Sequence, residues 1–393
     1  MSETIVDTRT DAVRRAETIS ATTRRSRSKH TELLFVIGFL YFASVVVMLC
    51  LNSKISAFGT LWASGRAASN GTNPYAEYPE SFRVDLEELF RIPFPPFADK
   101  NLNPPWVLPP LQAISHLPIK RAKQVQVLLS GLCFAIGCLI LITHQPAIRA
   151  RQVLWLLMCM PTFLTLGSGQ VYSWVFLVSA LAWMFNKTGR LVAAGIAAGA
   201  IVAFRPTMII WLLLLYLAGH RKIVGSSLVT ICSLYALPVF IYGTKIYIEW
   251  FHAFANDQHW RDPTNIALMP LFMRHGHTVV GFAIASGILF LSCWWALRFR
   301  PSFNLVSGAG LCIGMVCGPL GWWLYILFVA PFFMVRRWTA MPMIAACFFL
   351  IPPRISPTLG TCYLVATLMM LAFFMLEPTS SRIDELQHSP VRS

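Results

Sequence analysis

The acidic side chains of the long apolar region lie in two segments, and they are the groups that could act as acids, bases or sugar ligands. Between residues 35 and 376, carboxylates occur only in 77–99 and 249–262. They are Glu77, Glu80, Asp85, Glu87, Glu88, Asp99, Glu249, Asp257 and Asp262. The other connecting loops have no carboxylate, and several have Arg or Lys. We therefore expect the chemistry on one side of the protein, in loops 52–123 and 243–277, opposite a basic side.

The composition indicates a membrane protein. Hydrophobic residues make up 56% of the 393 residues and charged residues 12%, against about 25% charged in soluble domains. A bilayer-spanning helix needs about 20 mostly apolar residues. Windows of that kind, several of them short, cover 33–51, 124–143, 152–166, 171–185, 191–204, 207–219, 224–242, 278–297, 304–317, 322–335, 338–351 and 359–376.

These windows lack the alternation of a membrane barrel, and only helices or closed barrels satisfy the backbone in lipid. The sequence therefore predicts an all-α, multi-pass bundle of about twelve transmembrane helices, within two. The short pairs around Pro206 and Gly321 are open to a second interpretation as kinked or half-buried helices.

The orientation follows from Lys and Arg, which concentrate in cytoplasmic loops. Alternate loops carry Arg149 and Arg151, Lys187 and Arg190, Arg221 and Lys222, Arg298 and Arg300, and Arg336 and Arg337. We expect a disordered basic cytoplasmic tail at 1–31, a transmembrane domain at 32–376 and a polar cytoplasmic tail at 377–393. Both termini would be cytoplasmic in the cell inner membrane, with the acid-bearing loops outside.

The net charge of +15 is explained mostly by this topology, so we expect membrane lipids and no nucleic acid as partners. Lys120, Arg121 and Lys123 lie on the outer side, where they would meet a lipid phosphate or snorkel. The ten cysteines lie in or beside apolar runs, and no CxxC, Walker, GxGxxG or HExxH pattern occurs. We expect no metal and no cofactor.

The first outer loop holds several short motifs. Trp62 and Arg66 have the spacing of one helix face. Asn70-Gly71 and Asn73-Pro74 are turn signals. Asn101-Leu102-Asn103-Pro104-Pro105 is a rigid, polar entry into an apolar segment, 106–118. Pro109-Pro110 should break that segment and make it re-entrant or interfacial.

The order of these motifs resembles that of glycosyltransferase family 87, membrane mannosyltransferase-like proteins that use polyprenyl-phosphate sugars. The resemblance runs over about 35–340. It rests on W-A-S-G-R-A-A with G-x-N-P-Y at 62–75, N-L-N-P-P at 101–105, Gly169-Gln170, F-R-P at 204–206 and G-P-L-G-W-W-L-Y at 318–325. It implies a C-type glycosyltransferase fold with a catalytic acid in a large first external loop.

One position departs from the family pattern. An Asp usually precedes the W-A-S-G-R-A run by about five residues, and Ala57 stands there in this chain. No Asp or Glu lies between Asn52 and Tyr75. Three explanations remain: another carboxylate acts as the base, the activity has been lost, or the resemblance fails in detail.

A sugar linked to a phosphate already has its leaving group. The reaction then needs one carboxylate to take the proton of the attacking hydroxyl, with positioning and cationic stabilisation of the departing phosphate. We expect Asp99, beside the N-L-N-P-P turn, to be this base, followed by Asp85. The alternative for each is a solvated loop acid.

Several residues are candidates for substrate binding. Arg205 ends an apolar run before Pro206, and an ionisable group at membrane depth is functional by default. Its alternative is an interfacial Arg at a helix end. Arg66 and Arg274 are further cations, and an aromatic belt is the alternative for the Trp and Tyr rings. The predicted substrate-binding set is Arg66, Asn101, Asn103, Gln170, Arg205, Trp323 and Tyr325.

The sequence thus predicts a cell-envelope glycosyltransferase that moves a mannose-like hexose or a pentose from a polyprenyl-phosphate donor to a lipid or glycan acceptor. The transfer would take place on the outer face, with inversion. The alternative is an inactive member of the same fold that binds lipid-linked sugars or serves as a scaffold. A transporter is a third class, disfavoured because the two halves show no repeat.

Overall fold

The computed structural model describes residues 32–51, 57–76, 100–145, 148, 150–256, 265–351 and 359–376. All regular elements in these ranges are helices, which confirms the all-helical prediction. They are Glu32–Leu51, α2 (Phe58–Ser69), η2 (Pro105–Val107), α4 (Leu108–Ser115), α5 (Ile119–His144), α6 (Ala150–Met158), α7 (Met160–Ser168), α8 (Tyr172–Lys187), α9 (Leu191–Phe204), η3 (Pro206–Met208), α10 (Ile209–Leu217), α11 (Arg221–Tyr242), α12 (Lys245–Ala255), α13 (Leu268–Arg274), α14 (Thr278–Phe299), α15 (Phe303–Cys317), η5 (Trp323–Tyr325), α16 (Ile326–Met334), α17 (Ala340–Phe348) and α18 (Leu359–Leu376).

The helices differ in whether they are long enough to cross a membrane. Four helices in the described ranges are long and apolar enough to cross a membrane, or five if α6 and α7, bent by 42°, form one span. The four are Glu32–Leu51, α5, α11 and α14. Each of the other apolar windows also contains a helix, but a shorter one. The count of about twelve therefore stays a prediction.

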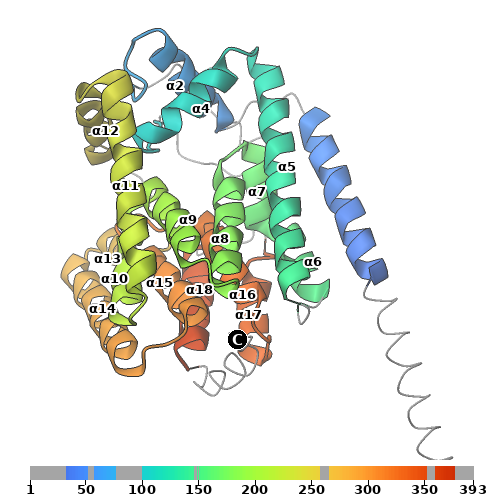
Figure 1. Cartoon of the computed structure of the whole chain (residues 1–393), viewed down its shortest axis with the longest axis vertical. Coiled ribbons are helices and arrows are strands. Elements are labelled where there is room, and N and C mark those ends of the chain that lie inside the picture. The colour runs from blue at the N-terminus through green and yellow to red at the C-terminus, as the bar shows by residue number, and fades with distance from the viewer. Residues whose placement is uncertain are drawn as a thin grey trace, which may run out of the picture.

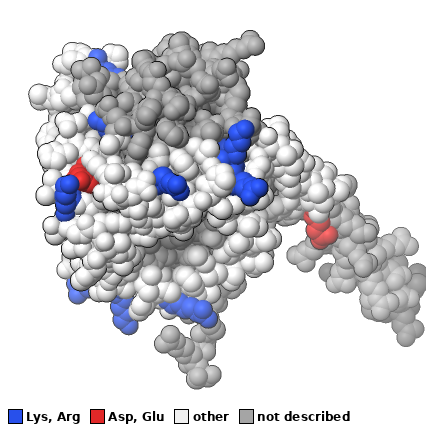
Figure 2. Space-filling view, turned by 90° about the horizontal axis from the view of Figure 1, so that it is seen from above, with Lys and Arg blue, Asp and Glu red and all other residues white. Residues whose placement is uncertain are grey.

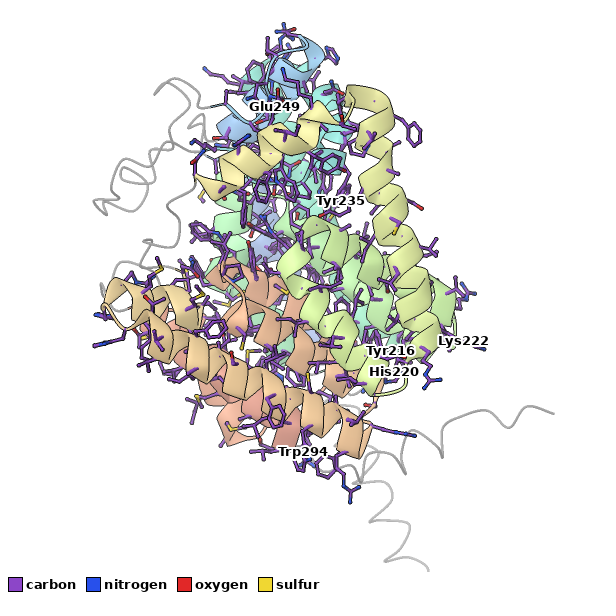
Figure 3. The ribbon with its side chains drawn as sticks, turned by 90° about the vertical axis from the view of Figure 1, so that its left-hand side faces the viewer. Tyr216, His220, Lys222, Tyr235, Glu249 and Trp294 are labelled. Atoms are coloured by element: carbon purple, nitrogen blue, oxygen red, sulfur yellow. The ribbon has the colours of Figure 1, made fainter. Side chains whose placement is uncertain are left out.

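The two ends of the molecule differ in the elements that form them. Helices α2, α4 and α12 form a cap at one end of the bundle (Figure 1). Glu249 lies in this cap, while His220 and Lys222 lie at the opposite end (Figure 3). Glu32 and Glu249 are the only carboxylates among the described residues, and red is accordingly sparse when the cap is viewed from above (Figure 2). We call the end with α2, α4 and α12 the cap, and the other the basic end.

Two pairs of short helices turn back below the cap. Lys187 of α8 donates a hydrogen bond to Gln145 after α5 (2.7 Å), so α9 starts at the basic end. Tyr216 of α10 also lies there (Figure 3), so the chain reverses at Arg205. The 14 residues of α9 rise only about 21 Å, less than the roughly 30 Å of a hydrocarbon core. The α15–α16 pair reverses in the same way at Gly318–Trp322.

Close helix contacts fix the position of the α9–α10 turn. A Cβ at Gly199 would lie 2.5 Å from the carbonyl oxygen of Ser227, so α9 and α11 touch through backbone. Ser227 reinforces the contact by donating a hydrogen bond to the carbonyl oxygen of Gly195 (2.9 Å). Small residues that let backbones approach are typical of membrane helix interfaces. The end of α9, and with it Arg205, is thus held against a long helix.

The cap is packed in a similar way. A Cβ at Gly65 would lie 2.3 Å from the carbonyl oxygen of Leu111, so α2 and α4 are in backbone contact. The expectation for Pro109 and Pro110 was wrong, because both lie in the first turn of α4. A proline there loses no helical hydrogen bond, so the pair begins a helix where a break was expected.

Candidate functional site

Arg205 is the centre of the polar cluster beneath the cap. Its guanidinium lies over three aromatic rings, those of Phe204 (4.8 Å), Tyr325 (5.3 Å) and Tyr172 (5.6 Å). It can do so because α9 ends at Phe204 and Pro206 starts the next helical turn. Ring faces attract cations, especially where water is excluded. The rings therefore stabilise the positive charge of the buried guanidinium without neutralising it.

The hydrogen bonds of Arg205 leave part of the guanidinium unused. Nη2 donates to the side-chain oxygen of Asn103 (3.2 Å) and to the hydroxyl of Tyr172 (2.8 Å). Nε is buried and has no hydrogen-bond partner. Among the described residues, no carboxylate pairs with this cation. A buried cation without a counter-ion is costly, and a bound anion would relieve the cost.

The segment 101–105 forms the second wall of the cluster. The Oδ1 atom of Asn101 accepts hydrogen bonds from the backbone N–H and the side-chain Nδ2 of Asn103, both at 3.0 Å. Both asparagines are buried, and Nδ2 of Asn101 has no partner. Trp106 ties the segment to α9 by donating to the carbonyl oxygen of Ala203 (3.0 Å).

The cluster is consequently rich in donors. The unpartnered Nε of Arg205 and Nδ2 of Asn101 flank Asn103, which contacts both residues. A buried donor without a partner costs about 1–3 kcal/mol, so such atoms call for an explanation. An anionic or oxygen-rich ligand would satisfy both donors, and preorganised donors of this kind also stabilise negative charge in a transition state.

Tyr75 connects this cluster to α12. Its hydroxyl donates to the carbonyl oxygen of Asn103 (3.2 Å), and its backbone N–H donates to the side chain of Asn73 (2.8 Å). Burial raises the pKa of Tyr75 above the usual range, and neighbouring charges that include Glu249 raise it further. The phenol thus stays protonated and remains a donor.

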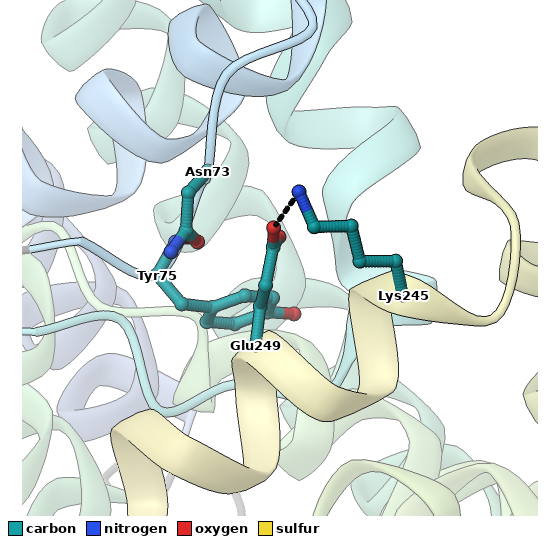
Figure 4. Close-up of polar contacts among 4 residues, drawn as sticks. All are labelled: Asn73, Tyr75, Lys245 and Glu249. Carbon is teal, nitrogen blue, oxygen red and sulfur yellow. Dashed lines mark hydrogen bonds and ion pairs between the residues drawn. The ribbon is translucent and has the colours of Figure 1, made fainter.

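Glu249 lies beside Tyr75 and Asn73 on the inner side of α12 (Figure 4). It forms an ion pair with Lys245 (3.3 Å), and the Glu249 and Lys245 side chains are 17% and 83% exposed, respectively. An ion pair with so exposed a partner contributes little to stability. Among the described residues, Glu249 is the only carboxylate in the cap.

The two predicted catalytic residues, Asp99 and Asp85, lie outside the described residues, as do Asp257 and Asp262. The structure does describe the position where the family pattern has Asp. Ala57 is buried, and its neighbour Phe58 packs against Gly169, where a Cβ would lie 2.7 Å from the Cβ of Phe58. Gly169 lies three residues before Tyr172, which accepts a hydrogen bond from Arg205.

The structure brings together only part of the predicted binding set. Asn101, Asn103, Arg205 and Tyr325 belong to one cluster. Gln170 is half-buried two residues before Tyr172, and its carbonyl oxygen accepts from Gln126 (3.5 Å). Its role in sugar binding stays a prediction.

The other predicted residues lie elsewhere. Arg66 is exposed and donates to the carbonyl oxygen of Ser115 (3.5 Å), on the same helix face as Trp62. Trp323 is buried and stacked on Tyr363, with ring centroids 4.9 Å apart. Arg274 donates to the carbonyl oxygen of Asn265 (3.4 Å).

Three residues of the cluster were not singled out from the sequence. Tyr172 follows the Gly169-Gln170 motif by two residues, Tyr75 ends the N-P-Y motif, and Glu249 is one of the nine acids of the two segments. The motifs indicated the first two, but no motif ranks Glu249 above the other acids.

A bundle of apolar helices with a buried, donor-rich cluster beneath its cap is the architecture of a membrane protein. The sequence profile of glycosyltransferase family 87 matches residues 101–320, more than half of the chain, so the chain belongs to this family of membrane glycosyltransferases. The matched range includes Asn101, Gln170 and Arg205 and excludes the 62–75 motif. No curated protein and no solved structure matches the chain.

Proposed function

We propose that this glycosyltransferase moves a mannose-like hexose or a pentose from a polyprenyl-phosphate donor to a lipid or glycan acceptor. In the proposed topology the transfer takes place on the outer face of the inner membrane, and both termini are cytoplasmic. Family membership supports sugar transfer. The choice of donor has separate support from the described cluster.

The observation that carries the donor assignment is the unpaired charge of Arg205. Its guanidinium has no carboxylate partner among the described residues, and its Nε and the Nδ2 of Asn101 are unpartnered donors. The 14 residues of α9 are too few to cross the hydrocarbon core, which supports a position of the cluster within the bilayer's thickness. A phosphate attached to a lipid reaches that depth, and a guanidinium fork suits its oxygens.

The proposed reaction needs one general base. The carboxylate takes the proton of the acceptor hydroxyl as the hydroxyl oxygen bonds to the anomeric carbon. The bond between the anomeric carbon and the phosphate oxygen breaks, and the prenyl phosphate leaves with the electron pair. Arg205 and Asn101 would stabilise the charge on that phosphate. Asp99 is the proposed base and Asp85 the second choice.

Incubating the purified protein with a radiolabelled mannosyl polyprenyl phosphate and a membrane-lipid extract tests the function. Incorporation of label into a glycolipid or glycan is the expected result. The same assay with Arg205→Ala separates the donor site from background hydrolysis. Absence of transfer with mannosyl and pentosyl donors alike would refute an active transferase of this class.

Ala57 favours a second candidate, the inactive lipid-linked-sugar binding protein. The residue is buried beside the turn that leads to Tyr172, where the family resemblance calls for Asp. If wild-type protein binds the donor without transferring sugar, and Ala57→Asp restores transfer, the chain has kept the binding site and lost the base. Transfer by the wild type that Ala57→Asp does not increase would exclude this candidate.

A further inference from the structure

Helix α12 differs from the rest of the cap because it presents a large apolar face outward. It follows α11 after a turn at Gly243, whose φ of +77° suits glycine. Its inner face packs on the protein through Ile246 and Ala253, which are buried. Trp250 on the same face donates to the carbonyl oxygen of Leu102 (3.1 Å). The inner face therefore holds the segment that carries Asn101 and Asn103.

The outer face holds Ile248 (57% exposed), Phe251 (65%) and Phe254 (39%), spaced three residues apart on the helix. This spacing places them on one broad stripe. Large apolar side chains with such exposure are rare on a water-facing surface when they are contiguous. Within the described part of the chain, nothing covers this stripe.

The stripe continues a surface that faces lipid. Helix α11 is long and apolar enough to cross the membrane. Its last turns expose Phe240 (85%) and Ile241 (50%) immediately before Gly243. Exposed apolar side chains thus lie on both sides of the turn at 243–245, at the end of α11 and on α12.

The edge of the stripe is polar. Lys245 at the start of α12 is 83% exposed, and His252 is exposed on the same side. A long Lys side chain next to apolar residues can reach lipid phosphates while its stem stays in the apolar layer. An apolar stripe bordered by polar and charged side chains is the pattern of a helix that lies in a membrane interface.

We infer that α12 is an interfacial helix whose Ile248–Phe251–Phe254 stripe inserts into the outer leaflet, between headgroups and acyl chains. The partner is the lipid bilayer itself. Because the opposite face of α12 binds the segment 101–105 through Trp250, the membrane contact fixes the depth of the Asn101–Arg205 cluster. The inference concerns membrane contact and holds whether or not the chain transfers sugar.

Spin-label depth measurements in liposomes test this inference. Single labels are placed by Phe251→Cys and, independently, Ile248→Cys, in full-length protein in which the exposed Cys232 and Cys347 are replaced by Ser. The unmodified Cys232→Ser/Cys347→Ser protein supplies the background signal. Phe282→Cys on the spanning helix α14, 63% exposed, is the lipid-facing control, and Asn70→Cys, exposed at the end of α2, is the water-facing control.

We expect labels at 248 and 251 to collide with oxygen and to be shielded from a water-soluble nickel complex, as at 282. Their depth should be about 5–10 Å into the boundary between headgroups and acyl chains. Accessibility to nickel equal to that at position 70 would overturn the inference. Shielding from both reagents would also overturn it, because a second protein surface would then cover the stripe.

Discussion

The two short helix pairs turn at similar places beneath the cap, yet their turns are satisfied in opposite ways. At the α15–α16 turn, the Oδ1 atom of Asn265 accepts hydrogen bonds from the N–H groups of Gly321 (3.0 Å) and Ala267 (3.1 Å). At the α9–α10 turn, Arg205 and Asn101 keep donors without partners. A buried polar group with all its hydrogen bonds made stabilises the fold, whereas a buried donor without a partner calls for an explanation, such as a bound ligand.

Each turn also has an arginine, and the two arginines sharpen the contrast. Arg274 donates to the carbonyl oxygen of Asn265 and so braces the α15–α16 turn. Arg205 lies between aromatic rings and meets neutral oxygens only. Arg274 thus supports its turn, whereas ligand binding is the proposed role of Arg205.

The largest expected effect concerns the proposed general base, Asp99. Asp99 precedes the segment that contacts Arg205 by a few residues, and Asp99→Asn removes basicity while keeping size. Loss of a general base lowers the rate about 10²–10⁴-fold, with donor binding unchanged. Rates of sugar transfer by Asp99→Asn and Asp85→Asn check this, and near-wild-type rates for both would direct attention to Asp257, Asp262 and Glu249.

The second prediction compares the two arginines directly. Arg205→Ala removes hydrogen bonds to a charged phosphate worth about 1.5–3 kcal/mol, so donor affinity should fall about 10- to 150-fold. Arg205→Lys keeps the charge without the fork and should fall less. Arg274→Ala should leave donor affinity unchanged and lower thermal stability. Equilibrium binding of a polyprenyl phosphate measures the donor affinity of all three variants. An equal loss of affinity in Arg205→Ala and Arg274→Ala would contradict different roles for the two arginines.

A third prediction tests what holds the α9–α10 turn in place. Gly199→Val forces side-chain atoms against the backbone of Ser227, and overpacking typically costs about 1–3 kcal/mol. We expect a lower midpoint of thermal unfolding together with weaker donor binding, because α9 carries Arg205. Gly225→Ala, on α11 with open space around the new Cβ, is the matched control. If Gly199→Val leaves both quantities unchanged, α9 and α11 are not in backbone contact.

The smallest expected effect is at the Lys245–Glu249 pair. Exposed ion pairs contribute at most about 1 kcal/mol, so Lys245→Met should change unfolding stability by no more than that. If Glu249 also serves the substrate, Glu249→Gln will lower transfer when Lys245→Met does not. Equal, small effects of both changes on stability and transfer would limit Glu249 to its ion pair.

The sequence predicted the helical membrane fold, because hydropathy reports on a bilayer directly. The acidic side stays a prediction, since eight of the nine acids lie outside the described residues, and so does the binding role of Arg205. Two separate motifs, at 101–105 and 204–206, put Asn101, Asn103 and Arg205 in one predicted binding set. The structure shows a hydrogen bond from Arg205 to Asn103. The predicted role of Trp323 in substrate binding stays a prediction. Its stacking on Tyr363 depends on packing between distant helices, which no local pattern indicates. The tie from Trp250 to Leu102 joins two loops 148 residues apart, which no local pattern encodes.

The shortness of α9 has an electrical consequence. In the proposed topology, Arg205 lies about 21 Å along α9 from the basic end, so about a third of the hydrocarbon core separates its charge from the outer surface. With the basic end inside, an interior-negative membrane potential opposes the inward movement of a singly charged phosphate to Arg205. At about 2.3 kcal/mol per charge per 100 mV, crossing a third of the field weakens donor binding about three- to fourfold. The membrane potential would thus change the affinity of the enzyme for its proposed donor.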